Sequence, residues 1–133
     1  MILLDTNILL RFILGDEPNL SSKAREIFEK IDKQKIKVYI TLLTISEVIF
    51  TLEKSYKLPK SEIISKILSI IKQANLNVEK QGLLQEVFSY YLGKNLSFVD
   101  AYHVAFMHKK KIKEIFSFDH DFDKFPQIKR LES

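Results

Sequence analysis

The chain has 133 residues, of which 46% are hydrophobic, and it contains no cysteine. This length predicts a single domain over residues 1–133 with enough apolar side chains for a core. The absence of cysteine excludes disulfides, thiolate zinc sites and thiol nucleophiles, and favours a cytoplasmic location. The N-terminus lacks the basic region of a signal peptide, and no apolar run is long enough to span a membrane. A net charge of +4 fits either a polyanionic partner or a merely soluble surface.

Hydrophobic periodicity predicts strands and helices in alternation along the first half of the chain. In chain order, the expected elements are a short buried strand at 2–4, a helix capped by Asn7, a helix from Ser21 or Ser22, a strand at 38–40 and a helix from Thr41 or Thr44. Pro59 is expected to begin the next helix. The inward positions of that helix are expected to be Ile63, Ile64, Ile67, Leu68 and Ile71.

The second half continues the same alternation. The expected elements are a strand at 76–78, a helix to about Leu92, a helix from Ser97 to about Lys110, a strand at 115–118 and a short edge strand at 128–131. Short apolar strands that alternate with helices predict an α/β fold. We expect a three-layer α/β/α sandwich with a central parallel sheet.

Four acids that lie far apart in the sequence adjoin these apolar segments: Asp5, Glu47, Asp100 and Asp119. Asp5 and Asp119 follow expected strands, and Glu47 and Asp100 are expected in the first turn of a helix. Because parallel sheets bind ligands at the carboxyl ends of their strands, we expect these acids to meet at that edge. A pocket of carboxylate oxygens favours a magnesium or manganese ion.

Each of these acids also has a structural interpretation. Asp5 fits a turn at the end of a strand. Glu47 and Asp100 each stand three residues after a hydroxyl residue, Thr44 and Ser97, as in a capping box. A helix N-terminus also keeps a carboxylate ionised, so capping and metal binding are compatible at Asp100.

Asp119, Asp121 and Asp123 form an alternating acidic loop. The loop lacks the glycine and the distal glutamate of an EF-hand, so a calcium loop is not favoured. Asp119 is nearest to the strand and is the first choice as a metal ligand, and Asp121 is a secondary ligand. Asp123 is expected to be a solvated loop or helix-start residue.

The remaining charged residues give weaker signals. His103 is expected in the core, and His108 and His120 at the surface, with no catalytic role for any of them. The lysine run at 109–113 fits a helix end that complements its dipole. Beside an acidic metal pocket, the same lysines would suit a phosphate backbone.

Taken together, the motifs resemble the PIN domain, and in length and element order they are similar to the VapC toxins. The resemblance rests on Asp5-Thr6-Asn7 after the first strand, Ser46-Glu47-Val48, Ser97-Phe98-Val99-Asp100-Ala101 and Ser117-Phe118-Asp119-His120-Asp121-Phe122. It implies an endoribonuclease with one or two Mg²⁺ or Mn²⁺ ions. The catalytic metal site is then carried onto Asp5, Glu47, Asp100 and Asp119. Thr6, Asn7 and Ser117 are the implied polar helpers for substrate or water.

The resemblance also implies an RNA substrate, a protein antitoxin that blocks the pocket, and a homodimer. Two other classes remain open at this stage. A receiver-type phosphoacceptor domain also gathers acids around magnesium, but its central-strand aspartate and late lysine are not convincingly placed. A non-catalytic RNA- or protein-binding module with a decayed site is the other alternative, and the presence of all four acids argues against it.

Overall fold

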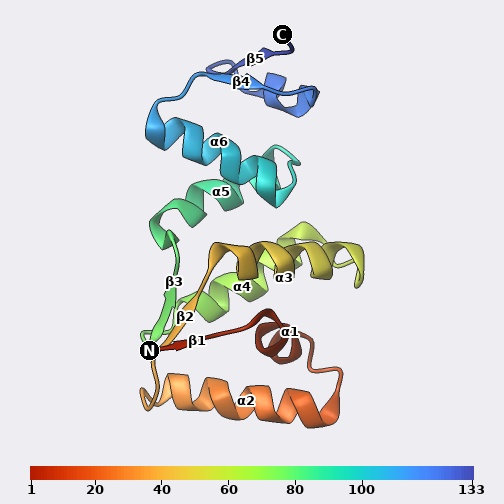
Figure 1. The fold of residues 1–133 in the computed structure, drawn as a ribbon. Coiled ribbons are helices and arrows are strands. Elements are labelled where there is room, and N and C mark those ends of the chain that lie inside the picture. Colours follow the sequence, from red (N-terminus) through yellow and green to blue (C-terminus); the bar gives the residue numbers. More distant parts are fainter. The chain divides into compact units, whose positions relative to one another are not determined.

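The structure, a computed structural model, describes residues 1–133 and contains two compact units, Met1–Gln81 (unit 1) and Gly82–Ser133 (unit 2) (Figure 1). Each unit combines helices with parallel strands, which confirms the α/β class expected from the sequence. The strands form two sheets, one in each unit, rather than the single sheet that was expected. The single domain over 1–133 therefore stays a prediction. No helix is both long and apolar enough to cross a membrane.

Unit 1 contains a sheet of three parallel strands, β1 (Ile2–Leu3), β2 (Val38–Ile40) and β3 (Leu76–Val78), in the order β1-β2-β3. β2 is the central strand, and both Val38 and Ile40 are buried. β1 has only one neighbour in this sheet, and its side chains are exposed, with burial starting at Leu4. The expectation of a buried strand at 2–4 is therefore wrong for its first two residues.

Four helices complete unit 1: α1 (Thr6–Leu14), α2 (Pro18–Asp32), α3 (Leu42–Lys54) and α4 (Lys60–Ile71). The N-cap of α1 is Asp5 and not Asn7. α2 begins three residues before Ser21, because Glu17 accepts hydrogen bonds from the backbone amides of the first turn and a proline occupies its first position.

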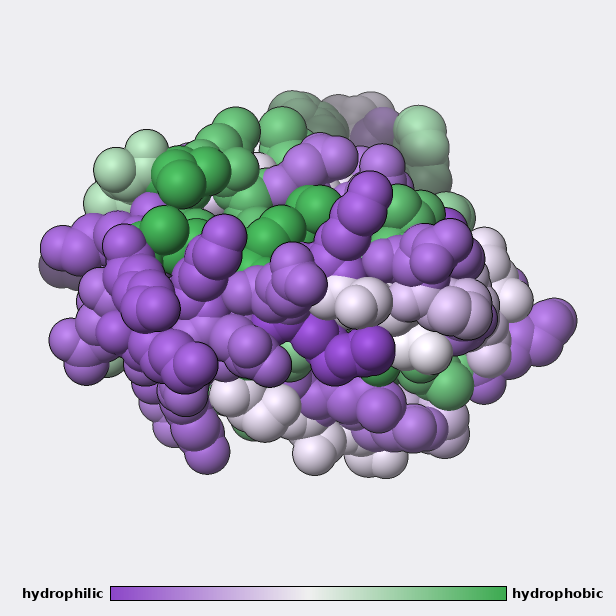
Figure 2. All heavy atoms as spheres, turned by 90° about the horizontal axis from the view of Figure 1, so that it is seen from below, coloured by the Kyte–Doolittle hydropathy of each residue, from purple (hydrophilic) through white to green (hydrophobic).

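The core of unit 1 is aliphatic and comes largely from α3 and α4, which lie side by side (Figure 1). α4 buries Ile63, Ile64, Ile67, Ile70 and Ile71. Leu68 was expected to point inward, but it is 38% exposed because it lies beside the buried stripe and not on it. α2 buries one stripe of side chains and turns its lysines and glutamates to solvent. Figure 2, which views the molecule from the side of α2, shows this largely hydrophilic surface.

In unit 2 two helices precede a small parallel sheet. The elements are α5 (Gln81–Gly93, whose first residue closes unit 1), α6 (Phe98–Lys110), β4 (Glu114–Phe116), a 3-10 helix η1 (His120–Lys124) and β5 (Lys129–Leu131). β4 pairs with β5 in parallel, with Ile115 opposite Arg130. The strand expected at 115–118 thus ends earlier, at Phe116. This leaves three residues between β4 and η1.

Candidate metal centre

Three aspartates of unit 2 come together at the start of α6 and of η1. One carboxylate oxygen from each of Asp100, Asp119 and Asp121 lies within 4.8 Å of the others. Asp100 and Asp121 are partly buried, and Asp119 is exposed. Three carboxylates at this spacing repel one another unless a cation or protons compensate them. The set consists of oxygen ligands alone, which fits Mg²⁺ or Mn²⁺ better than zinc.

Local helix capping positions Asp100. It is the third residue of α6, and its backbone amide donates to Oγ of the N-cap residue Ser97 over 3.1 Å. This is the hydroxyl half of the capping box expected from the sequence. The carboxylate of Asp100 consequently lies in the first turn, where the helix dipole favours a negative charge.

Two local hydrogen bonds shape the loop that carries the other two acids. The backbone amide of Asp119 donates to Ser117 Oγ over 3.0 Å. The backbone amide of Asp121 donates to Asp119 Oδ1 over 2.9 Å, which makes Asp119 the N-cap of η1. Ser117 was expected to position substrate or water, and its hydroxyl here accepts a backbone hydrogen bond. The tight turn presents both carboxylates to Asp100.

Burial and neighbouring charge act together on the acids of the cluster. Burial raises the pKa of Asp100 above its ordinary value, and the negative charge of Asp119 raises it further. A hydrogen bond from Ser97 and the charge of His103 act in the opposite direction. His103 was expected in the core, but it is exposed, one helical turn after Asp100. A bound divalent cation would remove the repulsion between Asp100 and Asp119.

Lys124 is a residue of this region that the sequence reasoning missed. Its ammonium nitrogen lies 3.0 Å from Asp121 Oδ1 and 2.9 Å from the backbone carbonyl oxygen of Lys94. The available signal was the spacing of three residues between Asp121 and Lys124, which places both side chains on one side of a 3-10 turn. Lys124 thus balances part of the negative charge of the cluster.

Asp5 and Glu47 belong to unit 1, whereas the cluster lies in unit 2. Asp5 is exposed and is the N-cap of α1, yet its side chain makes no capping hydrogen bond. Its carboxylate is therefore not used by the helix that follows it. Whether Asp5 meets the acids of unit 2 stays a prediction.

Glu47 is not the capping residue that the sequence suggested. Thr41 is the N-cap of α3, and its Oγ1 accepts from the backbone amide of Thr44 over 3.2 Å. Glu47 is consequently the sixth residue of the helix, beyond the first turn. It is exposed between two exposed apolar neighbours, Leu43 (82%) and Phe50 (64%). No helix cap accounts for this acid, and its place in the metal site stays a prediction.

The two other polar helpers differ in accessibility. Thr6 is buried at 5% exposure, whereas Asn7 is exposed in the first turn of α1. Of these two, only the side chain of Asn7 is available to a substrate in unit 1. Asn7 is thus the better candidate for contacting a phosphate or a water ligand.

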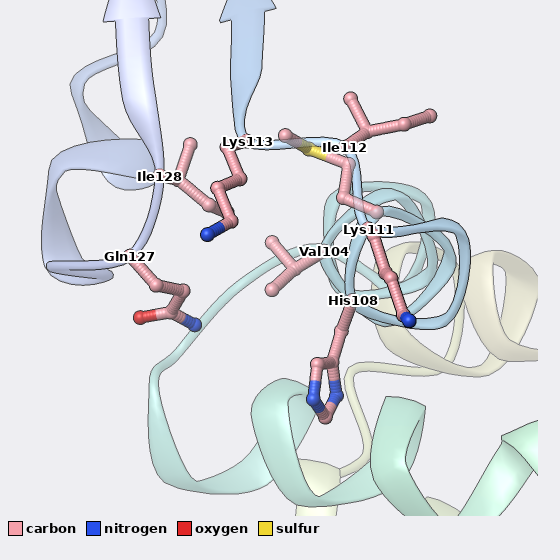
Figure 3. A pocket seen from close by; sticks show the side chains of 8 residues that line it. Val104, His108, Lys111, Ile112, Lys113, Gln127 and Ile128 are labelled. Carbon is pink, nitrogen blue, oxygen red and sulfur yellow. The ribbon is translucent and has the colours of Figure 1, made fainter.

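The lysine run lies at the opposite end of α6 from Asp100. Ten residues separate Asp100 from Lys110, which is about 15 Å along a helix axis. The lysines therefore do not adjoin Asp100 along this helix, and Lys109 and Lys110 stand in its last turn, as expected for residues that complement the helix dipole. A pocket of about 260 Å³ beside them contains no carboxylate (Figure 3). Its lining residues are Val104, Met107, His108, Lys111, Ile112, Lys113, Gln127 and Ile128.

Comparison with known proteins identifies the family. A family model described as the PIN domain matches residues 2–128, which is nearly the whole chain. The chain belongs to the PIN domain family. The resemblance found in the sequence motifs is therefore confirmed. Its cluster in unit 2 contains two of the four acids that the PIN resemblance assigned to the metal site, Asp100 and Asp119, together with Asp121.

Two individual proteins are similar to this PIN protein. A VapC ribonuclease of Aquifex aeolicus (strain VF5) is 29% identical over 124 residues, which cover 93% of this chain and 91% of the relative. The crystal structure of VapC20 of Mycobacterium tuberculosis, described as a toxin that cleaves the sarcin–ricin loop, matches with a TM-score of 0.45. That match has 19% sequence identity and covers 93% of this chain and 94% of the other.

Proposed function

We propose that this PIN protein is a divalent-metal-dependent endoribonuclease and the toxin of a toxin–antitoxin pair. The observation that carries the proposal is the cluster of Asp100, Asp119 and Asp121, whose carboxylate oxygens lie within 4.8 Å of one another. Membership of the PIN family supports it. So does the similarity over most of both chains to a protein named VapC ribonuclease.

The cofactor is one or two Mg²⁺ or Mn²⁺ ions. Asp100, Asp119 and Asp121 would hold the metal, and Asp5 and Glu47 are proposed as further ligands because the PIN resemblance also assigns them to the site. A bound divalent cation activates water and stabilises the charge that develops on a phosphodiester. The protein's own contribution is to fix the ligands: Ser97 caps the helix that presents Asp100, and the turn at Ser117 orients Asp119. Asn7, which is exposed, contacts a phosphate oxygen or a water.

The partners follow from the charge of the site. The proposed substrate is RNA; because the carboxylates themselves repel phosphates, a bound cation would supply the attraction that lets RNA approach the site. An antitoxin blocks the site by placing a basic side chain among the same carboxylates, much as Lys124 already pairs with Asp121. We further propose that the chain acts as one domain in a cytoplasmic homodimer.

The decisive test is cleavage of a structured RNA by the purified full-length chain with Mg²⁺, with Mn²⁺ and with a chelator. We expect cleavage with either ion and none with the chelator. Asp119→Asn should reduce the cleavage rate by about a hundredfold or more, because the metal contributes several kcal/mol to transition-state stabilisation.

Glu114→Gln is the matched control, since it removes one exposed negative charge from the same unit outside the cluster. It should cleave at the rate of the unmodified chain. RNA binding without cleavage in every metal tested would contradict the nuclease proposal and favour a binding module. Cleavage by Asp119→Asn at full rate, after purification that excludes contaminating nucleases, would remove Asp119 from the site.

A further inference from the structure

Arg130 on β5 touches the acidic loop at both of its ends. Its Nη1 donates to the backbone carbonyl oxygen of Ser117 over 3.0 Å, two residues before Asp119. Its Nε donates to Asp123 Oδ1 over 3.1 Å, two residues after Asp121. The guanidinium therefore spans the segment that carries two of the three clustered acids. The side chain of Arg130 is only 11% exposed, although its partners are largely at the surface.

A third contact reaches the middle of the loop. Nη2 of Arg130 lies 3.0 Å from His120 Nδ1. The same Nδ1 also lies 3.0 Å from Asp123 Oδ2, so the tautomer of His120 decides whether it accepts from Arg130 or donates to Asp123. His120 lies between Asp119 and Asp121 in the sequence. Its contact with Arg130 therefore ties the guanidinium to the part of the loop between the two acids. The fourth contact, to Glu132 Oε1 at 2.7 Å, lies outside the loop.

The three alternating aspartates of the loop have different partners. Asp119 and Asp121 belong to the cluster with Asp100, whereas Asp123 does not. The hydrogen bond from Arg130 holds the pKa of Asp123 below its usual range. Asp123 was expected to be a solvated loop or helix-start residue, and it is indeed exposed within η1, where it also binds the guanidinium of Arg130. Parallel pairing places Arg130 opposite Ile115 and so brings the C-terminal strand beside the loop.

We propose that Arg130 is a positioning residue, which holds the segment 117–123 in the conformation where Asp119 and Asp121 share a divalent cation with Asp100. This role rests on the proposed function, because it presupposes a metal at the cluster. Arginine suits the role because its planar fork donates in several fixed directions at once. A lysine ammonium has no such fork. Groups that orient metal ligands contribute to metal affinity without touching the ion.

The test is the affinity of the full-length chain for Mn²⁺, measured by titration calorimetry and by the electron paramagnetic resonance signal of free Mn²⁺. Arg130→Met keeps much of the aliphatic stem and removes every donor. We expect its dissociation constant for Mn²⁺ to rise roughly tenfold. The spectrum of bound Mn²⁺ should also change, because the geometry of its ligands changes. Circular dichroism and the melting temperature establish that the variant is folded.

Glu132→Gln is the matched control, because Glu132 binds the same guanidinium but lies outside the loop. Its Mn²⁺ affinity should equal that of the unmodified chain. Asp123→Ala tests the same anchor from the loop side and serves if Arg130→Met does not fold. We expect Asp123→Ala to weaken Mn²⁺ binding as well, and the double variant to lose less than the two single losses combined.

The outcomes separate this inference from the proposed function. If the unmodified chain binds no Mn²⁺, the metal centre itself is refuted and the inference falls with it. If the unmodified chain binds Mn²⁺ and Arg130→Met binds it equally well, the metal centre stands and only the role of Arg130 is refuted. An equal loss in Glu132→Gln would also overturn the inference, because the effect would then be one of general charge.

Discussion

The acids of the two units differ in how much the surrounding chain already constrains them. In unit 2, Asp119 accepts from the amide of Asp121, Asp121 pairs with Lys124, and Asp100 stands in the first turn of a capped helix. In unit 1, Asp5 makes no capping bond and Glu47 lies on the exposed side of α3. The three acids of unit 2 are held close together by the chain itself, whereas Asp5 and Glu47 of unit 1 have no local contact of that kind.

Carboxylates that are already held together lower the stability of the fold, but they also lower the entropy cost of binding a cation. Holding carboxylates together raises the pKa of Asp100 through burial and through the charge of Asp119, so the metal-free fold carries an unfavourable term. In return, less ligand ordering remains to be done when a cation binds. Asp5 and Glu47 of unit 1 lie outside this cluster. If they join the site, we expect them to refine metal binding that unit 2 already supports.

The largest expected effect comes from testing whether the two units are separate at all. Ile63→Ala empties a fully buried position in α4 and should lower the free energy of unfolding by about 2–5 kcal/mol. If the chain is one domain, native-state hydrogen exchange should show amides of both units losing protection together. Accelerated exchange confined to unit 1 would contradict the single-domain prediction.

Leu68→Ala is the natural comparison for that experiment, because Leu68 lies on the same helix but is 38% exposed. Its effect on the free energy of unfolding should be clearly smaller, since less apolar surface and a smaller cavity are involved. Equal destabilisation by both variants would mean that the burial of α4 is not as described.

The next effect addresses the acids of unit 1 directly. Asp5→Asn and Glu47→Gln should each raise the dissociation constant for Mn²⁺ by about tenfold and slow RNA cleavage, as expected for ligands of a shared site. The melting temperature without metal should be unchanged or slightly higher for Asp5→Asn, because relief of carboxylate repulsion stabilises the chain. Unchanged Mn²⁺ affinity would confine the metal centre to unit 2. A large fall in the metal-free melting temperature of Asp5→Asn would instead mark Asp5 as structural.

The smallest expected effect concerns the cost of the cluster in unit 2. The folded chain raises the pKa of Asp100, so the folded state binds the proton more tightly than the unfolded state does. Ionised Asp100 therefore destabilises the fold above its folded-state pKa, and the penalty disappears below its ordinary value of 3.8. Metal-free Asp100→Asn should melt slightly higher than the unmodified chain at pH 7.

Measuring the difference in melting temperature between Asp100→Asn and the unmodified chain at several pH values tests whether the ionised carboxylate causes it. Melting curves in a chelator should converge as the pH falls below 3.8, because Asp100 is then mostly protonated in both the folded and the unfolded state. A constant difference at every pH would show that the substitution acts through packing or through the helix dipole. Such a result would weaken the contrast between the two units.

Several features of this protein followed from local sequence alone. The strand at 38–40, the strand at 76–78 and the helix from Ser97 were predicted at or near their observed bounds, because apolar periodicity and end signals lie within each segment. The cap of Asp100 by Ser97 is equally local. The family resemblance needed only short motifs and their order, and the match over residues 2–128 confirms it.

Where two local signals competed, the sequence did not choose between them. Thr41 and Thr44 both fit the N-cap of α3, and the choice of Thr41 moved Glu47 out of the first turn. Glu17 began α2 before either serine. In both cases the segment offered more than one capping side chain, so local signals alone did not fix the first residue of the helix.

By itself, the sequence determined the order of strands and helices, the PIN family and the identity of the candidate ligands. Only the tertiary structure decided that Asp100 meets Asp119 and Asp121, that Lys124 pairs with Asp121 and that Arg130 spans their loop. The physical reason is the separation along the sequence over which each interaction acts. Capping and periodicity act within a few residues, whereas the contacts of Arg130 exist because β4 and β5 pair side by side across the intervening chain.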